Sequence, residues 1–162
     1  MKLTFDGISP CWEEGIPLGN GRMGAVLCSE PETDVLYLND DTLWSGYPHA
    51  ETSPVTPEIV AKARQASLHD DYTAATRIIK EATLQEKDEQ IYEPFGTARI
   101  QYSIPAGGRE SMKRQLDLAR ALAGETFQMG DANVHVDAWC SEPDDLLVYR
   151  MSSDAPVDVK IS

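Results

Sequence analysis

Three glycines within six residues, Gly19, Gly21 and Gly24, are the feature that most constrains the fold of this chain. Their G-x-G-x-x-G spacing also occurs where the pyrophosphate of a dinucleotide meets the start of a helix. Here the short apolar run 25–28 follows the last glycine and is typical of a strand. No strand-like run precedes Gly19. The spacing therefore predicts a tight turn that leads into a strand, and it disfavours a dinucleotide site.

A second polar run begins where the strand predicted at 35–38 ends. Asp40 and Asp41 are adjacent, and paired carboxylates suit metal binding or acid–base catalysis. The two carboxylates of a glycosidase, however, face each other across the sugar at about 5–10 Å. Neighbouring residues in a strand point to opposite faces. An Asx turn is therefore expected here, and we predict no catalytic residue in this chain.

Six side chains from the two runs are candidates for contact with a substrate. They are Asn20, Arg22, Asn39, Asp41, Thr42 and Trp44. Short or forked hydrogen-bonding groups on rigid loops suit sugar hydroxyls, and an indole face suits either a sugar ring or partial burial in the core. The alternative is that Arg22 pairs with Asp40 or Asp41 only to hold the turn, which contributes ~0–1 kcal/mol. We expect the two loops to lie together at one edge of the fold.

The charge of the chain restricts its partners. Acidic residues number 27 against 14 basic ones, which gives a formal net charge of −13. Such a balance repels nucleic acid and anionic membranes, so neither is an expected partner, whereas a neutral carbohydrate fits. With 162 residues and 41% hydrophobic residues, the chain is long enough for one core.

Cysteine and histidine spacing gives no sign of a metal or a cofactor, and none is predicted. Cys11, Cys28 and Cys140 are far apart, without a C-x-x-C pair. They are expected to be reduced thiols, although a disulfide between two of them stays open. The three histidines show no ligand spacing. The sequence begins without an apolar leader and has no stretch of about 20 apolar residues, so a cytoplasmic location is expected.

Two helices are predicted in an insertion at about 56–84. Thr56 is suited to an N-cap, with Pro57 at the first helical position. Apolar residues then recur at helical spacing on one face of each helix: Ile59, Val60, Ala63 and Ala66, then Tyr72, Ala75, Ile79 and Ala82. These faces predict a helical hairpin that packs against a sheet.

The rest of the chain has the pattern of short strands. Candidate strands are 3–5, 24–28 and 35–38, followed by alternating sets at Ile100, Tyr102 and Ile104; Ala121, Ala123 and Glu125; Val134, Val136 and Ala138; Leu146, Val148 and Tyr149; and Val157, Val159 and Ile161. Turn signals separate them. The sequence predicts a mainly β fold, an antiparallel β-sandwich with an inserted α-helical hairpin.

Longer motifs point to a family. The run from Trp12 to Ala25, with Glu13, Glu14, Pro17 and the glycine turn, and the run from Leu38 to Gly46 resemble the amino-terminal domain of glycoside hydrolase family 95, the α-L-fucosidase and α-L-galactosidase group. The later motifs Tyr92, Pro94 and Gly96, and Arg114, Leu116, Asp117 and Leu118, agree with the same family. The amino-terminal domain of family 65 is the next neighbour. The polar segment 83–91 departs from the pattern.

The resemblance implies that residues 1–162 form an amino-terminal sandwich, part of a super-sandwich, that precedes a helical toroid. Catalytic residues belong to that toroid, which these residues do not include. The last residues alternate like a strand and stop without a turn signal, so the sandwich is expected to be truncated at its C-terminal end.

The expected function is a non-catalytic module of an inverting α-L-fucosidase-like hydrolase. It would support its helical catalytic domain and lend loops to the sugar pocket, and alone it would be inactive. The alternative is a stand-alone carbohydrate-binding or structural β-sandwich. The sequence does not specify which sugar is bound.

Overall fold

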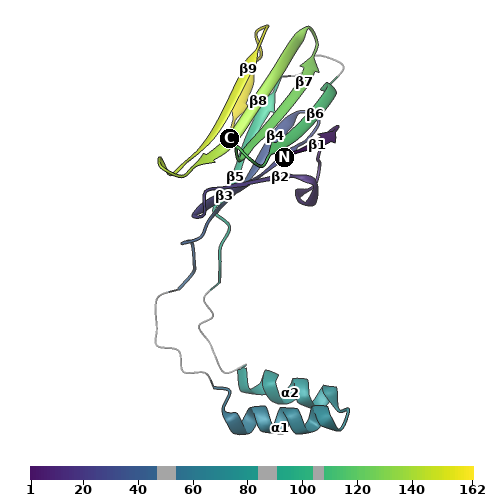
Figure 1. The fold of residues 1–162 in the computed structure, drawn as a ribbon, viewed down its shortest axis with the longest axis vertical. Coiled ribbons are helices and arrows are strands. Elements are labelled where there is room, and N and C mark those ends of the chain that lie inside the picture. The colour runs from purple at the N-terminus through teal and green to yellow at the C-terminus, as the bar shows by residue number, and fades with distance from the viewer. Residues whose placement is uncertain (47–53, 84–90, 104–107) are drawn as a thin grey trace. The chain divides into compact units, whose positions relative to one another are not determined.

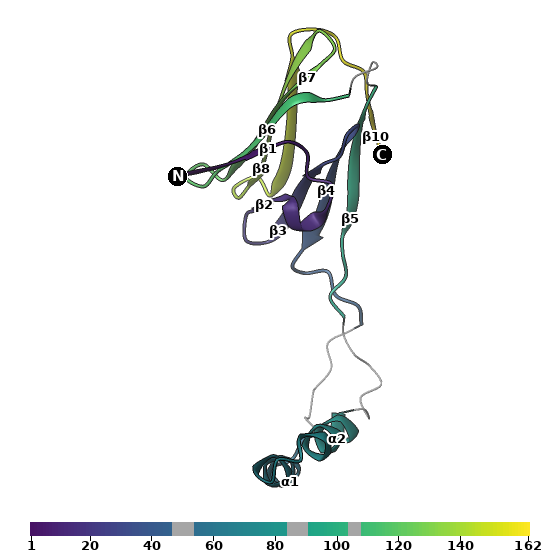
Figure 2. The same ribbon diagram turned by 90° about the vertical axis from the view of Figure 1, so that its right-hand side faces the viewer.

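The computed structural model describes residues 1–46, 54–83, 91–103 and 108–162. The chain forms two compact units, one of residues 1–43 with 94–162 and the other of residues 44–93. The first unit consists of two five-stranded antiparallel sheets (Figures 1 and 2). The second contains a pair of helices. The predicted mainly β fold with an inserted helical hairpin is therefore confirmed.

Each sheet joins strands from distant parts of the sequence. The first has the order β1 (Lys2–Asp6), β6 (Glu110–Asp117), β7 (Leu122–Met129), β8 (Ala132–Ser141) and β9 (Leu146–Ser153). The second has the order β10 (Val159–Ile161), β5 (Gly96–Tyr102), β4 (Thr33–Asp40), β3 (Met23–Ser29) and β2 (Ile16–Gly19). A short 3-10 helix, η1 (Trp12–Glu14), lies between β1 and β2.

The hydrophobic core lies between the sheets. Side chains alternate along β8, so that Val134, Val136 and Ala138 are buried in the first sheet. Leu27 of β3 and Leu36 of β4 are paired in register and are buried in the second. One continuous cluster joins residues of both sheets, which is the arrangement expected of a sandwich.

Two strands were not predicted. β2 is only four residues long and contains Pro17, which an edge strand tolerates because its outer N–H needs no partner. A strand therefore does lead into the glycine turn, and the expectation that no strand precedes Gly19 was wrong. β6 has the inward alternation Met112, Arg114 and Leu116, with all three buried. A buried arginine at the centre of the set conceals the period-two pattern.

Several residues expected at strand positions lie elsewhere in the structure. In β9 the inward side chains include Leu147 and Tyr149, whereas Leu146 is 56% exposed. Ala121 lies in the turn before β7 and has a φ of 50°. Val157 precedes β10, and Ile104 lies outside the described residues.

The second unit contains α1 (Pro57–Leu68) and α2 (Tyr72–Thr83). Thr56 is the predicted N-cap, and its hydroxyl accepts a hydrogen bond from the Ile59 amide at 3.4 Å. Ala63 is the buried residue of α1, whereas Val60 is 39% exposed and so does not belong to the buried face expected for it.

The apolar face of α2 is only partly covered within its unit. Ala75 and Ile79 are half-buried and line an open groove on the hairpin, while Tyr72 is 63% exposed and is not part of the buried stripe expected for it. Packing of this face on a sheet stays a prediction. Neither helix in the described ranges has the length and apolar character needed to cross a membrane.

Candidate functional site at the glycine-turn end of the sandwich

Asn20 organises the turn between β2 and β3. Its side-chain Oδ1 accepts hydrogen bonds from the amides of Arg22 at 3.0 Å and Met23 at 2.9 Å. The backbone N–H of Asn20 donates to the Met23 carbonyl at 3.1 Å. Gly21 has a φ of +102°, which residues with a Cβ rarely adopt. The predicted tight turn that leads into strand β3 is present.

The same asparagine connects the two sheets. Its Nδ2 donates to the Ser141 carbonyl at 3.0 Å and to Asp145 Oδ1 at 3.2 Å, and both acceptors belong to the β8–β9 hairpin of the other sheet. An asparagine side chain has two donor hydrogens and two acceptor lone pairs. All four are used within the sandwich, so Asn20 is a tie between the sheets.

Arg22 forms two ion pairs. Its Nη1 bonds to Asp145 Oδ2, and its Nη2 lies 3.4 Å from Asp40 Oδ2. The alternative interpretation of Arg22, that it pairs with Asp40 or Asp41 to hold the turn, predicted the pair with Asp40. Because the Arg22 side chain is 54% exposed, water screens these pairs, and each contributes only ~0–1 kcal/mol.

The end of β4 lies beside the glycine turn. Asn39 is paired in register with Gly24, and the Asp41 amide donates to the Arg22 carbonyl at 3.0 Å. The two polar runs are therefore side by side, as predicted. They occupy one end of the second sheet, next to the β8–β9 hairpin of the first.

Asp40 forms the Asx turn expected here. Its Oδ1 accepts bonds from the Thr42 hydroxyl at 2.6 Å and the Thr42 amide at 3.0 Å. Chiefly these bonds, with a small contribution from Arg22, lower the pKa of the Asp40 carboxyl. Asp40 is therefore ionised at neutral pH, and the Thr42 hydroxyl is engaged in holding the loop.

A small apolar pocket opens between the strand ends. Its volume is about 90 Å³, and it is lined by Met23, Gly24, Leu38, Asn39, Asp40, Phe95 and Leu147. Phe95 is 62% exposed at the rim, and Asn39 is also exposed. The lining of the pocket is almost entirely apolar and its volume is well below the ~300–1,000 Å³ typical of ligand sites, so it has room only for a small apolar group.

Trp44, the sixth candidate, belongs to the second unit. Its ring packs edge-on against Tyr92, with centroids 5.2 Å apart and planes at 69°. The next residue, Ser45, donates its amide N–H to the Ile91 carbonyl at 2.8 Å. Trp44 is still 54% exposed, so its indole offers a stacking face. That it joins the other five candidates at one site stays a prediction.

Sequence reasoning missed Asp145, the partner of both Asn20 and Arg22. It lies in an ordinary acidic turn more than 120 residues further along the chain, and no local pattern marks it. Among the residues that the structure describes, no group of three or more histidine, cysteine or acidic side chains is placed to hold a metal ion.

A second polar cluster inside the sandwich was also missed. Asp34 is fully buried and is bonded by Arg109 Nη1 at 2.5 Å, by the Tyr102 hydroxyl at 2.6 Å and by the Tyr149 hydroxyl. Burial, followed by the charge of Asp34, raises the pKa of both tyrosines, so both stay protonated as donors. The sequence signal was a charged residue at an inward strand position.

Comparison with known proteins agrees with the fold. The profile of the family described as "Glycosyl hydrolase family 65, N-terminal domain" matches residues 3–162. Alpha-L-fucosidase 2 of Arabidopsis thaliana is 30% identical over 158 residues, which are 96% of this chain and 18% of that protein. The probable alpha-fucosidase A of Aspergillus niger is 28% identical, over 96% of this chain and 21% of its own. The chain thus spans about a fifth of the length of these relatives.

Proposed function

Because this chain belongs to the family of glycosyl hydrolase family 65 N-terminal domains, and so is a glycoside hydrolase amino-terminal module, we propose that it is the non-catalytic part of an inverting α-L-fucosidase-like hydrolase. Its proposed partners are the helical catalytic domain of that enzyme and a neutral carbohydrate. The observation that carries the proposal is the extent of the match: 96% of this chain aligns with only 18% of an alpha-L-fucosidase. The catalytic residues of such a protein can then lie in the remaining four-fifths of its sequence.

The polar side chains at the glycine-turn end favour a structural role for this module. Hydrogen bonds within the sandwich itself engage the side chains of Asn20, Asp40 and Thr42. A site for acid–base hydrolysis needs two carboxyl groups aimed at one sugar from opposite sides. The carboxylates of Asp40 and Asp145 instead hold Arg22. These groups give the loops fixed positions, as a rigid scaffold for a neighbouring site requires.

Asn39 is the residue through which this end would reach a sugar. It is exposed, and it lies beside the glycine turn, in register with Gly24. Leu38, its neighbour in β4, packs against the core, so the Asn39 side chain lies on the opposite face of the sheet, where its amide is accessible from outside the sandwich. We therefore assign substrate contact to Asn39 ahead of Asn20 and Arg22.

The test is an assay of the 162-residue chain with an aryl α-L-fucoside. We expect no release of the aryl group above that of a heat-denatured sample. Turnover that persists through repurification and is absent from the denatured control would contradict the non-catalytic assignment.

Carbohydrate binding without any catalytic partner is the second candidate. Two indoles favour it, because Trp12 is 58% exposed and Trp44 is 54% exposed, and both can stack on a sugar face. Titration calorimetry of the chain with neutral fucosylated oligosaccharides separates the two functions. Saturable binding that is lost in Trp12→Ala or Trp44→Ala would favour the binding module over the supporting one.

A further inference from the structure

Three ionisable side chains are fully enclosed between the two sheets. Asp34 of β4 and Arg109, which precedes β6, have no exposed side-chain surface, and Glu125 of β7 is 1% exposed. Removing a charge from water costs several kcal/mol unless a partner and hydrogen bonds compensate it. The partners of these three groups therefore decide which of them can be charged.

Asp34 is fully compensated. One oxygen receives the Arg109 Nη1 donor, and the other receives the hydroxyls of Tyr102 and Tyr149. Three donors on one carboxylate, one of them cationic, compensate for its removal from water. The Asp34–Arg109 pair is thus a neutral unit, further held by the guanidinium packing over the Tyr102 ring at 4.3 Å.

Glu125 has no such compensation. Its Oε1 accepts one hydrogen bond, from the Ser29 hydroxyl, and its Oε2 is buried without a partner. Nε and Nη2 of Arg109 are also buried and unpartnered, so these donors are not bonded to Glu125. Burial of a negative charge on a carboxylate with only one hydrogen bond is energetically unfavourable, so the neutral, protonated form is favoured.

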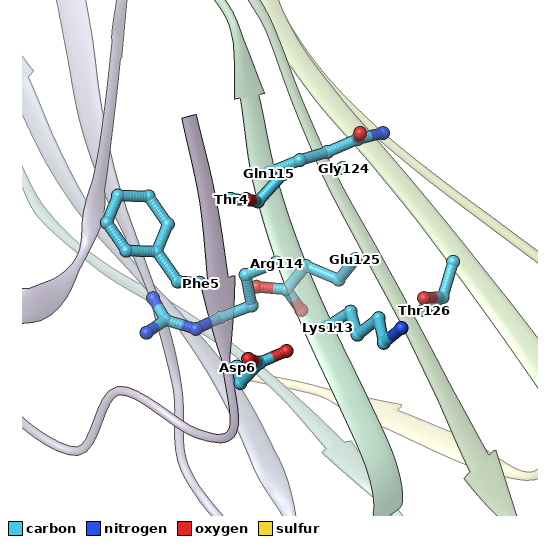
Figure 3. A pocket seen from close by; sticks show the side chains of 9 residues that line it. All are labelled: Thr4, Phe5, Asp6, Lys113, Arg114, Gln115, Gly124, Glu125 and Thr126. Atoms are coloured by element: carbon cyan, nitrogen blue, oxygen red, sulfur yellow. The ribbon is translucent and has the colours of Figure 1, made fainter. Parts of the chain in front are cut away.

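Arg114 of β6, the other cation that influences Glu125, donates its hydrogen bonds to other groups. It pairs in register with Glu125, but its Nε and Nη1 donate to the carbonyls of Gly7 and Glu14, each at 2.9 Å. Figure 3 shows its guanidinium extending past the Glu125 carboxylate to lie beside the Phe5 ring. The cation therefore fastens the N-terminal segment to the sheet and forms no hydrogen bond with Glu125.

We propose that Glu125 carries a proton in the folded sandwich at neutral pH, and that the sandwich therefore loses stability as the pH rises from acidic to mildly alkaline values. Burial and the nearby Asp34 charge raise the pKa of Glu125 to about 8, against the opposing influence of Ser29, Arg109 and Arg114. Glu125 also interacts electrostatically with Cys28 of β3, whose pKa is raised to about 11 by burial, so that this thiol is neutral at these pH values.

The sign of the pH dependence follows from the proton count. The unfolded chain releases the Glu125 proton near pH 4.5, whereas the folded chain keeps it to about pH 8. Between these values the folded state binds one more proton, so rising pH favours unfolding. The equilibrium constant for unfolding then increases about tenfold per pH unit through this group and levels off above the folded pKa.

The test is urea denaturation of the 162-residue chain and of Glu125→Gln across this pH range. Glutamine keeps the shape and cannot ionise, so the ratio of the wild-type to the variant unfolding constant should rise about tenfold per unit between about pH 5 and pH 7.5. Glu110→Gln, at an exposed position of β6, should give a flat ratio. A flat ratio for Glu125→Gln would overturn the proposal.

A measurement on the unaltered chain covers the case in which Glu125→Gln fails to fold. Carbon-13 labelling of glutamate carboxyl groups reports each titration by NMR. One glutamate carbon that titrates more than about two units above the ordinary value near 4.3 supports the proposal. If every glutamate in the folded chain titrates near its ordinary value, Glu125 is ionised at neutral pH and the proposal is wrong.

Discussion

Replacing Asn20 by alanine tests the tie between the two sheets. The substitution removes four side-chain hydrogen bonds, two that close the glycine turn and two that reach the β8–β9 hairpin. A typical intramolecular hydrogen bond contributes a net ~1 kcal/mol, and bonds that share one side chain are not additive. The part-buried position leaves the freed groups only partly accessible to water. We therefore expect a loss of about 2–3 kcal/mol in the free energy of unfolding.

Asn39→Ala is the matched control for this measurement. It removes the same side chain from the neighbouring strand, where asparagine is exposed, so the expected change is within about 0.5 kcal/mol. Urea denaturation followed by tryptophan fluorescence gives both values at one pH. Asn20→Asp, which keeps the acceptor oxygens but loses the amide donors beside Asp145, should fall on the destabilised side as well. Equal midpoints for Asn20→Ala and Asn39→Ala would refute the cross-sheet tie.

The remaining predictions concern the second unit and the enzyme of which this module is proposed to be a part. Ile79→Ala should cost about 2–5 kcal/mol if the apolar face of α2 is covered by a sheet, and an unchanged denaturation midpoint would show that the face stays exposed. Thr56→Ala should lower the stability of the helical hairpin by about 1 kcal/mol, measured by thermal melting in circular dichroism, while Thr73→Ala, at an exposed position of α2 outside the groove, serves as the control. In the full-length enzyme, Asn39→Ala and Trp44→Ala should lower kcat/KM more than stability; intact kcat/KM with a lowered Tm would assign both residues to the fold.

The architecture was predictable where local pattern and global burial agree. The alternation Val134, Val136 and Ala138 predicted an inward-facing strand, and Thr56 with Pro57 predicted the start of a helix. The glycine turn was predictable because only a turn, with a strand after it, explains the residues around Gly21. In each case the nearest neighbours in the sequence also determine the conformation.

Prediction failed where a distant partner decides the role of a residue. Arg114 conceals strand β6, because its buried guanidinium is compensated by carbonyls about 100 residues away. Asn20 and Arg22 were chosen as sugar-contact candidates for their chemistry, but Asp145 engages both side chains. The sequence shows which side chains can form hydrogen bonds, whereas their partners depend on the tertiary fold. The same limit concealed the buried Asp34 cluster.

Complementation tests the central claim most directly. The 162-residue chain and the rest of the proposed enzyme, expressed as two separate pieces, would be mixed and assayed with an aryl α-L-fucoside. If the chain is a supporting module, neither piece alone should release the aryl group, and the mixture should do so in proportion to the limiting piece. Full activity of the other piece without this chain, or activity of this chain alone, would contradict the account.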